Sequence, residues 1–502
     1  MLFNSPIYIF LFLPVVIALY YLLNKTRLTV IGKSWLVLAS LFFYGYWNPK
    51  YLLLIIGSML VNFAMGNALH RRRNRGSAHH SHSTRRRVLA GGIVFNLALL
   101  GCFKYADFVL GNLNFALGSS IHLLDLALPL GISFFTFQQI AYLVDCYKEE
   151  TKEYDFLNYC LFISFFPQLI AGPIVHHREI MPQFMKIRAK VLNWSNISTG
   201  IFIFCVGLFK KIVVADTFAV WANAGFDSPH PMGLLVAWGT SLSYTFQLYY
   251  DFSGYSDMAI GAALLFNIKL PINFNSPYKA KNIREFWQRW HITLSNFLRD
   301  YIYIPLGGNR AGKYRTYLNL FITFLLGGLW HGAGWTFVVW GGLHGAALVA
   351  HRLWSRAGLR MPWPVGWFST FMFVNFAWVF FRASSFEGAL RVLEGMVGIN
   401  GIETSTMLAD IMWRSKEWAT MAFGVSLVDT ATQIDNFAYI IVFGFAAFLL
   451  PNTMQAVRFA PYRGDMVFKP SFVYAVFVGM ILFYSLVSNI QNAPSQFLYF
   501  NF

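Results

Sequence analysis

Long apolar runs alternate with short polar segments along almost the whole chain. Most runs approach or exceed the roughly 20 residues that a helix needs to cross the hydrocarbon core of a bilayer. The pattern predicts spans at 6–23, 30–47, 51–69 and 88–112, and further apolar blocks at 120–145, 156–174, 199–222, 233–266, 317–350, 365–382, 436–450 and 472–488. Some blocks are too long for one crossing and others are interrupted. We therefore expect an all-α polytopic membrane protein with roughly 10–13 transmembrane helices plus re-entrant and interfacial helices.

Composition supports the bilayer as the solvent of this chain. Of the 502 residues, 57% are hydrophobic and 12% are charged, whereas soluble domains contain about 25% charged residues. A soluble fold cannot bury that much apolar surface. A transmembrane barrel would show alternating stretches of about ten residues, and the sequence sustains none. No internal repeat is visible, which argues against an inverted-repeat transporter.

The basic residues gather in loops and predict an orientation. Lys25, Arg27 and Lys33 separate the first two spans, and the third loop, 70–87, carries seven arginines. Because positively charged loops stay in the cytoplasm, both loops are expected inside and the N-terminus outside, in the periplasm. The net charge of +17 therefore indicates contact with anionic headgroups and not with nucleic acid. The first 23 residues lack a basic start and a cleavage site, so we expect a retained span.

Neither a metal site nor a disulfide framework is predicted. His79, His80 and His82 lie in the third loop and resemble a metal-binding tract, but a solvated polybasic loop explains them better. The four cysteines lie apart in apolar segments without C-x-x-C spacing (Cys102, Cys146, Cys160 and Cys205). They are interpreted as packing residues.

The segment 283–299 has apolar residues at helical spacing and basic residues largely on the opposite side. This pattern predicts one amphipathic helix at the cytoplasmic interface. His291 lies within the apolar stripe, where a buried packing residue is a more common role than a catalyst. Basic residues flank the segment and are suited to attracting an anionic donor such as a phosphopantetheine-bearing carrier (Lys279, Lys281, Arg310, Lys313 and Arg315).

A second histidine lies in a long uncharged segment. Residues 317–350 contain no formal charge and would form a helix of about 51 Å, too long for one crossing of about 30 Å. We expect the break at 327–334, where four of eight residues are glycine, and this places His331 at irregular backbone deep in the membrane. A neutral histidine in such a cavity is able to accept a proton from a hydroxyl. Helix packing is the alternative for His331, and packing is the preferred interpretation for His344.

Two further segments introduce polar or rigid residues into apolar surroundings. Asp251 and Asp257 enter the block 233–266, but a spacing of six residues puts them about 120° apart on a helix. Structural pairing is therefore favoured over a proton relay or a paired-carboxylate site. The stretch Phe165–Ile174 contains two prolines, which predicts a re-entrant loop or a kinked span.

These segments, in this order, resemble the membrane-bound O-acyltransferase (MBOAT) family, and most closely its bacterial branch of alginate and peptidoglycan O-acetylases. The matching stretches are Pro167–Ile174, Tyr250–Gly261, Phe286–Ser295, Arg299–Arg310 and Gly328–Ala333. The likeness runs from the first span to about residue 350. It implies N-terminal helices at 1–112, a catalytic core at 113–355 and C-terminal helices at 356–502. One departure is Gln288 before Arg289, where relatives commonly have two basic residues.

The resemblance implies an enzyme that encloses a tunnel through the bacterial inner membrane. It implies His331 as the base and His291 as a supporting residue near the donor path. The expected reaction moves an acetyl group from a cytoplasmic thioester, acetyl-CoA or an acyl carrier, to a cell-envelope polysaccharide such as alginate or peptidoglycan. A periplasmic acetyltransferase or acceptor protein is the expected partner, and no resident cofactor is expected. The alternatives are D-alanyl transfer to teichoic acid, a proton-coupled transporter and a structural scaffold.

Overall fold

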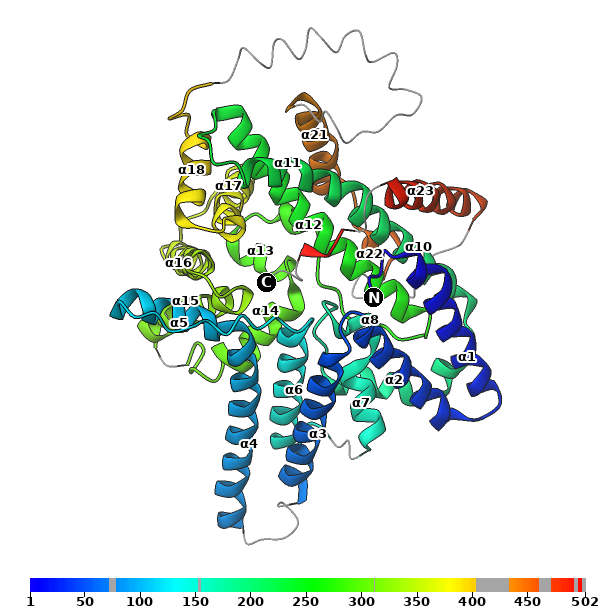
Figure 1. Ribbon diagram of the computed structural model, residues 1–502. Coiled ribbons are helices and arrows are strands. Elements are labelled where there is room, and N and C mark those ends of the chain that lie inside the picture. The colour runs from blue at the N-terminus through cyan, green and yellow to red at the C-terminus, as the bar shows by residue number, and fades with distance from the viewer. Residues whose placement is uncertain are drawn as a thin grey trace. The chain divides into compact units, whose positions relative to one another are not determined.

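The computed structural model describes residues 1–71, 78–151, 155–310, 312–402, 433–459, 471–491 and 495–498. Most of these residues are helical (Figure 1). No strand is assigned among them. The chain forms two units: Met1–Leu208, Tyr255–Asn273 and Val457–Phe502 form the first, and Phe209–Gly254 and Phe274–Ala456 form the second. The boundary between the units falls at the end of α10 and inside α12.

The first unit is built from helices contributed by both ends of the chain. They are η1 (Tyr8–Phe12), α1 (Leu13–Lys25), α2 (Thr29–Gly45), α3 (Lys50–Arg71), α4 (Ala78–Leu100), η2 (Gly101–Tyr105), α5 (Ala106–Leu117), α6 (Ile132–Tyr147), α7 (Phe156–Ser164), α8 (Phe166–Leu169), α9 (His177–Met185), η3 (Ile187–Lys190), α10 (Trp194–Phe209) and α23 (Phe472–Gln491). The side-chain amide of Asn489 donates to the carbonyl of Asn4. The two ends of the chain therefore meet inside this unit.

Helices α3, α4 and α6 run side by side in the first unit (Figure 1). Their buried faces carry amides: the Nδ2 of Asn96 donates to the Oδ1 of Asn62 at 2.6 Å, and the Nδ2 of Asn62 donates to the Oε1 of Gln139 at 2.8 Å. Helices in a bilayer gain little from burying apolar side chains, so such interhelical hydrogen bonds help to hold them together.

The second unit contains the segments that the sequence singled out for chemistry. Its helices are η4 (Lys210–Ala215), α11 (Asp216–Phe226), α12 (Leu234–Leu264), η5 (Pro277–Lys279), α13 (Ile283–Arg289), α14 (Ile292–Leu298), η6 (Arg299–Tyr303), α15 (Lys313–His331), α16 (Trp335–Arg356), α17 (Trp363–Arg382), α18 (Phe386–Met396), α21 (Gln433–Leu449) and α22 (Thr453–Ala456). The last turns of α12 belong to the first unit.

The predicted break in the long uncharged segment is confirmed. Helix α15 ends at His331 and α16 begins at Trp335, with Gly332 and Gly334 in extended backbone between them. The two helices then pack tightly, because a Cβ atom on Gly328 would lie 2.3 Å from the carbonyl oxygen of Phe337. Glycine at this position allows the two backbones to approach closely.

The predicted single helix over 283–299 is wrong. The segment folds as α13 and α14, and His291 between them adopts a left-handed backbone with φ +41°. Side-chain periodicity could not reveal this elbow, because a non-glycine residue seldom adopts positive φ. The apolar block 233–266, by contrast, is the single 31-residue helix α12.

Six helical stretches in the described part of the chain are long and apolar enough to cross a membrane: Tyr8–Lys25, Lys50–His70, Ser83–Leu117, Trp194–Phe226, Trp363–Arg382 and Phe472–Ile490. Two shorter apolar helices, Thr29–Gly45 and Asp435–Leu449, accompany them. The chain is therefore a polytopic helical membrane protein. The crossing count and the division at 112 and 355 stay predictions.

Candidate active site

His331 is the last residue of α15, directly before the glycine break. Its side chain is buried, with 3% of the residue exposed. Three aromatic rings surround the imidazole, with centroid distances of 4.8 Å to Trp330, 5.1 Å to Trp340 and 5.1 Å to Phe381. The break in the helix thus places an imidazole in an aromatic environment that excludes water.

His291 occupies the elbow between α13 and α14 and is fully buried. Its ring lies edge-on to Phe252 of α12 at 4.7 Å and to Trp330 at 6.3 Å. Trp330 therefore contacts both His291 and His331. The structure brings the two predicted site residues, 40 positions apart in the sequence, to one aromatic side chain of the second unit.

His344 lies on α16 and packs against the same aromatic group. Its ring is 4.8 Å from Trp340, and its Nδ1 accepts a hydrogen bond from the Nε1 of Trp287 at 3.2 Å. Trp340 thus contacts both His331 and His344. The bond from Trp287 engages one nitrogen of His344 in holding α13 to α16, which agrees with the packing role expected for it.

Trp340 on α16, Trp378 on α17 and Trp290 at the elbow form an aromatic wall beside these histidines. Trp340 stacks on Trp378 at 5.5 Å, and Trp290 lies 5.0 Å from Trp378. All three are buried. Such a wall lowers the local dielectric, which strengthens interactions between a bound group and nearby dipoles.

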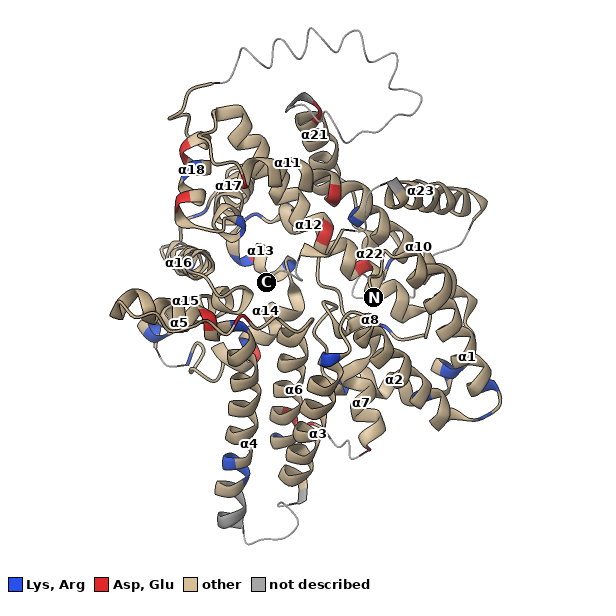
Figure 2. Cartoon of the chain, in the orientation of Figure 1, with Lys and Arg blue, Asp and Glu red and all other residues tan. Residues whose placement is uncertain are grey.

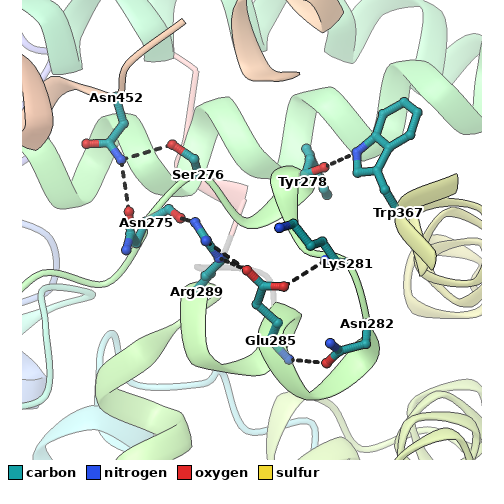
Figure 3. Close-up of polar contacts among 9 residues, drawn as sticks. All are labelled: Asn275, Ser276, Tyr278, Lys281, Asn282, Glu285, Arg289, Trp367 and Asn452. Atoms are coloured by element: carbon teal, nitrogen blue, oxygen red, sulfur yellow. Dashed lines mark hydrogen bonds and ion pairs between the residues drawn. The ribbon is translucent and has the colours of Figure 1, made fainter. Parts of the chain in front are cut away.

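A polar network fixes the helix that precedes the elbow (Figure 3). The guanidinium of Arg289 donates to the carboxylate of Glu285 at 2.8 Å and to the carbonyl of Asn275 at 3.1 Å. In return, the amide of Asn275 donates to the carbonyl of Arg289 at 2.9 Å. Asn452 donates to the side chains of Asn275 and Ser276. These hydrogen bonds fix the backbone at Arg289, one residue before Trp290 and two residues before His291.

The start of α13 and the adjacent turn η5 are fixed by the same group of residues (Figure 3). Asn282 caps α13 by accepting from the amide of Glu285 at 2.9 Å, and Trp367 donates to the carbonyl of Tyr278 at 2.8 Å. Lys279 donates to the carbonyl of Leu450 at 2.7 Å, just beyond α21. Of the basic residues expected to attract a donor, Lys279 is therefore engaged in tethering the end of a helix.

A buried charge cluster centred on Lys211 was not predicted. The Nζ of Lys211 lies 2.7 Å from Oδ1 of Asp251 and 2.7 Å from Oδ1 of Asp216. Lys211 sits in the π-helical turn η4, and such turns are common at functional positions. Asp251 therefore has a structural ion-pair partner, as expected, and this partner lies 40 residues away in the sequence. Asp257 is also buried, on the part of α12 that belongs to the first unit.

The proline-containing stretch in the first unit is not a plain helix. It forms the four-residue helix α8 and a turn, and its residues are buried. A Cβ atom on Gly172 would lie 2.4 Å from the Cα of Gln168. This departure from regular helix agrees with the prediction, and the compact turn requires glycine at this position.

A histidine–aspartate pair in the first unit was also not predicted. The Nδ1 of His176, in the loop before α9, lies 3.7 Å from Oδ2 of Asp145. Hydrogen bonding to this carboxylate raises the pKa of His176 above its usual value of 6.5, against the opposing effect of burial. His176 therefore favours its charged form more than an isolated imidazole does.

No group of three metal-ligating side chains occurs among the described residues, and the four cysteines form no disulfide there. The side chains of His79, His80 and His82 lie outside the described residues. Nothing in the described part of the chain therefore suggests a metal centre.

The fold and these features define a polytopic membrane protein with a histidine buried at a broken helix. The model of the MBOAT, membrane-bound O-acyltransferase family, matches residues 17–387, and the chain belongs to this family. It is accordingly an O-acyltransferase. Both predicted site histidines lie within the matched region.

Two relatives span most or all of the chain, and a third spans less than half of it. It is 45% identical to a peptidoglycan O-acetyltransferase of Helicobacter pylori, over all of this chain and 98% of that protein. It is 41% identical to a probable alginate O-acetylase of Pseudomonas aeruginosa, over 79% of this chain and 75% of that protein. A teichoic acid D-alanyltransferase of Streptococcus thermophilus is 31% identical over 45% of this chain and 57% of that protein.

Proposed function

We propose that this enzyme is an O-acetyltransferase of the bacterial inner membrane that acts on a cell-envelope polysaccharide. The acetyl group comes from a cytoplasmic thioester, acetyl-CoA or an acyl carrier, and leaves on the periplasmic side. Peptidoglycan is favoured over alginate because the similarity to the Helicobacter pylori peptidoglycan enzyme extends over the whole chain, whereas that to the Pseudomonas aeruginosa alginate protein covers 79% of it. A periplasmic acetyltransferase or acceptor protein completes the pathway in this proposal.

The observation that carries the proposal is the position of His331. It is buried at the end of α15, beside a glycine break and against three aromatic rings. An imidazole protected from water acts as a general base when it is neutral. His331 would accept the proton of the acceptor hydroxyl while the oxygen attacks the thioester carbonyl. The C–O bond forms, the C–S bond breaks, and the leaving thiolate takes up a proton.

His291 is proposed as a supporting residue that shapes the path of the donor. Its contact with Trp330 connects it to the ring that also contacts His331. A change at His291 would therefore reach the base through the orientation of Trp330. Arg310, Lys313 and Arg315 remain candidates for attracting the anionic donor.

D-alanyl transfer to teichoic acid is the less favoured reaction. The similarity to the D-alanyltransferase of Streptococcus thermophilus covers less than half of this chain. The greater length of this chain and its GGNR stretch at 307–310 also argue against that reaction. The chain belongs to an acyltransferase family, and no observation favours the transporter or the scaffold.

The test compares His331→Ala with His344→Ala at matched expression and measures the O-acetyl content of the purified envelope polysaccharide. Loss of a general base lowers the rate about 10²- to 10⁴-fold, so acetylation should disappear in His331→Ala. His344→Ala should retain acetylation in proportion to the folded protein present. Full acetylation in His331→Ala would overturn the assignment, and equal specific loss in both variants would mean that the histidines act through folding.

A further inference from the structure

The segment between α9 and α10 exposes cations and large apolar side chains on the first unit. Lys186 and Arg188 are exposed and Lys190 is half-buried. Among the apolar neighbours, Ile187 is 78% exposed and Trp194 is 74% exposed. Residues 180–200 contain no acidic side chain. We define residues 185–194 as the η3 platform.

The backbone of the η3 platform is fixed from its buried side. Asn267 donates to the carbonyls of Arg188 at 3.2 Å and Val191 at 2.8 Å, and Tyr20 donates to the carbonyl of Ala189 at 3.4 Å. Ala189 itself is buried. With the carbonyls turned inward, the cationic and apolar side chains are held on the outer surface.

Further cations lie on segments that pack against the platform. Helix α1 contacts η3, and Lys25 and Arg27 at its end are exposed. Figure 2 shows basic positions, in blue, at the end of α1. Lys269 is also exposed, and its backbone amide and carbonyl are both hydrogen bonded to the side chain of Gln183 on α9. The surface around the η3 platform is therefore strongly positive.

We propose that the η3 platform lies in the headgroup layer of the membrane and binds anionic phospholipids. The candidate span Trp194–Phe226 begins at its last residue, and a helix that crosses the membrane from this residue leaves the platform at a membrane surface. Lysine and arginine place their charged ends among phosphates while their stems cover apolar surface, and tryptophan favours the same layer. Each cation near an anionic leaflet raises the local affinity about fivefold.

An acidic soluble protein fits this surface less well. Large apolar side chains flank the cations on both sides, with Met185 and Ile187 before Arg188, and Val191 and Trp194 after Lys190. Immersion in lipid buries all of them at once. This binding is independent of the proposed acetyl transfer.

The experiment uses the full chain in nanodiscs, with its four cysteines replaced and one new cysteine carrying an environment-sensitive NBD fluorophore. Ile187→Cys reports on the platform. Ile121→Cys is the matched control, because Ile121 is also exposed in the first unit but its neighbours between 118 and 130 include no lysine or arginine. Quenching by spin-labelled phosphatidylglycerol is compared with quenching by spin-labelled phosphatidylcholine at equal mole fraction.

Phosphatidylglycerol should quench the fluorophore at position 187 at least threefold more effectively than phosphatidylcholine, and the two lipids should be equal at position 121. Lys186→Gln, Arg188→Gln and Lys190→Gln together should equalise the two lipids at 187. The side chains of these three residues make no hydrogen bond or ion pair with the residues that the structure describes, so the variant should fold. Equal quenching without these substitutions, no quenching by either lipid, or a response only to an acidic soluble protein would each overturn the proposal.

Discussion

At the scale of single residues, the buried ion pair of Lys211 and Asp251 predicts how substitutions change the stability of the fold. Lys211→Met leaves the carboxylate of Asp251 buried without its cation, which costs about 3–5 kcal/mol for a buried pair. Lys211→Met combined with Asp251→Leu removes both charges and should recover most of that loss. Asp216 is about one quarter exposed, so its carboxylate is less deeply buried than that of Asp251. Thermal unfolding of the detergent-purified protein measures each step.

With Asp251→Leu alone added, these variants form a double-mutant cycle, which isolates the pairwise interaction. If the double variant is as unstable as Lys211→Met, the pair is not the source of the loss. Loss of acetyl transfer with full stability would instead indicate that the cluster takes part in the reaction.

The residues also differ in how far the sequence could predict them. His331 was predicted because the uncharged segment 317–350 is too long for one crossing, and the glycines at 327–334 indicate where its helix breaks. Lys211 was missed because it lies in an apolar block and its partner Asp251 lies on another helix. The left-handed backbone of His291 was missed because the side-chain pattern around it remains helical on both sides.

At the scale of helices, the packing of α15 against α16 depends on small residues at defined positions. Gly328→Ala would place a Cβ atom 2.3 Å from the carbonyl oxygen of Phe337, and backbone cannot move aside as easily as a side chain. We expect a loss of about 1–3 kcal/mol or more from overpacking. Gly342→Ala is the matched control, because its nearest contact, with Leu325, would be at 3.8 Å. That change should be neutral or slightly stabilising.

Unfolding temperatures of the two alanine variants in one detergent provide the comparison. Equal temperatures for both variants would contradict tight packing at Gly328. Since Gly328 lies three residues before His331, acetyl transfer by the folded fraction of the Gly328 variant should fall as well.

The clamp on α13 predicts that Arg289 is a positioning residue for the elbow at His291. Arg289→Gln loses the ion pair with Glu285 and the charged bond to the carbonyl of Asn275. Because small displacements near a reacting group cost up to about 100-fold in rate, kcat should fall roughly 10- to 100-fold with KM little changed. Arg289→Lys keeps the charge and should recover part of the rate.

Steady-state acetyl transfer from acetyl-CoA, where it serves as donor, or from a loaded carrier checks this prediction. Arg284→Gln is the control on the same helix, since Arg284 is exposed and makes no hydrogen bond or ion pair within the described part of the chain. An unchanged kcat in Arg289→Gln, or an equal fall in Arg284→Gln, would contradict a positioning role. Unfolding temperatures separate loss of rate from loss of fold.

At the scale of the whole molecule, hydropathy predicted the class of the protein and little of its internal organisation. Helix length and composition follow from the bilayer, so the polytopic character was accessible from sequence. The two units are not consecutive segments, because 255–273 and 457–502 pack with the first 208 residues. Stacking of Tyr255 on Phe3 and on Phe497 brings together three regions that no sequence pattern connects.

The orientation of the molecule is a prediction that rests on the charges of its loops. Lys25 lies in the first loop, and this loop is predicted to be cytoplasmic. Lys50 lies after the turn that follows α2, and this turn is predicted to be periplasmic. In a background without native cysteines, Lys50→Cys should react with a membrane-impermeant maleimide in intact spheroplasts. Lys25→Cys should react only after the membrane is permeabilised. Both positions are exposed and both substitutions remove one lysine, so each serves as the control for the other. Reaction of Lys25→Cys in intact spheroplasts would reverse the orientation, and the η3 platform beside α1 would then face the outer leaflet.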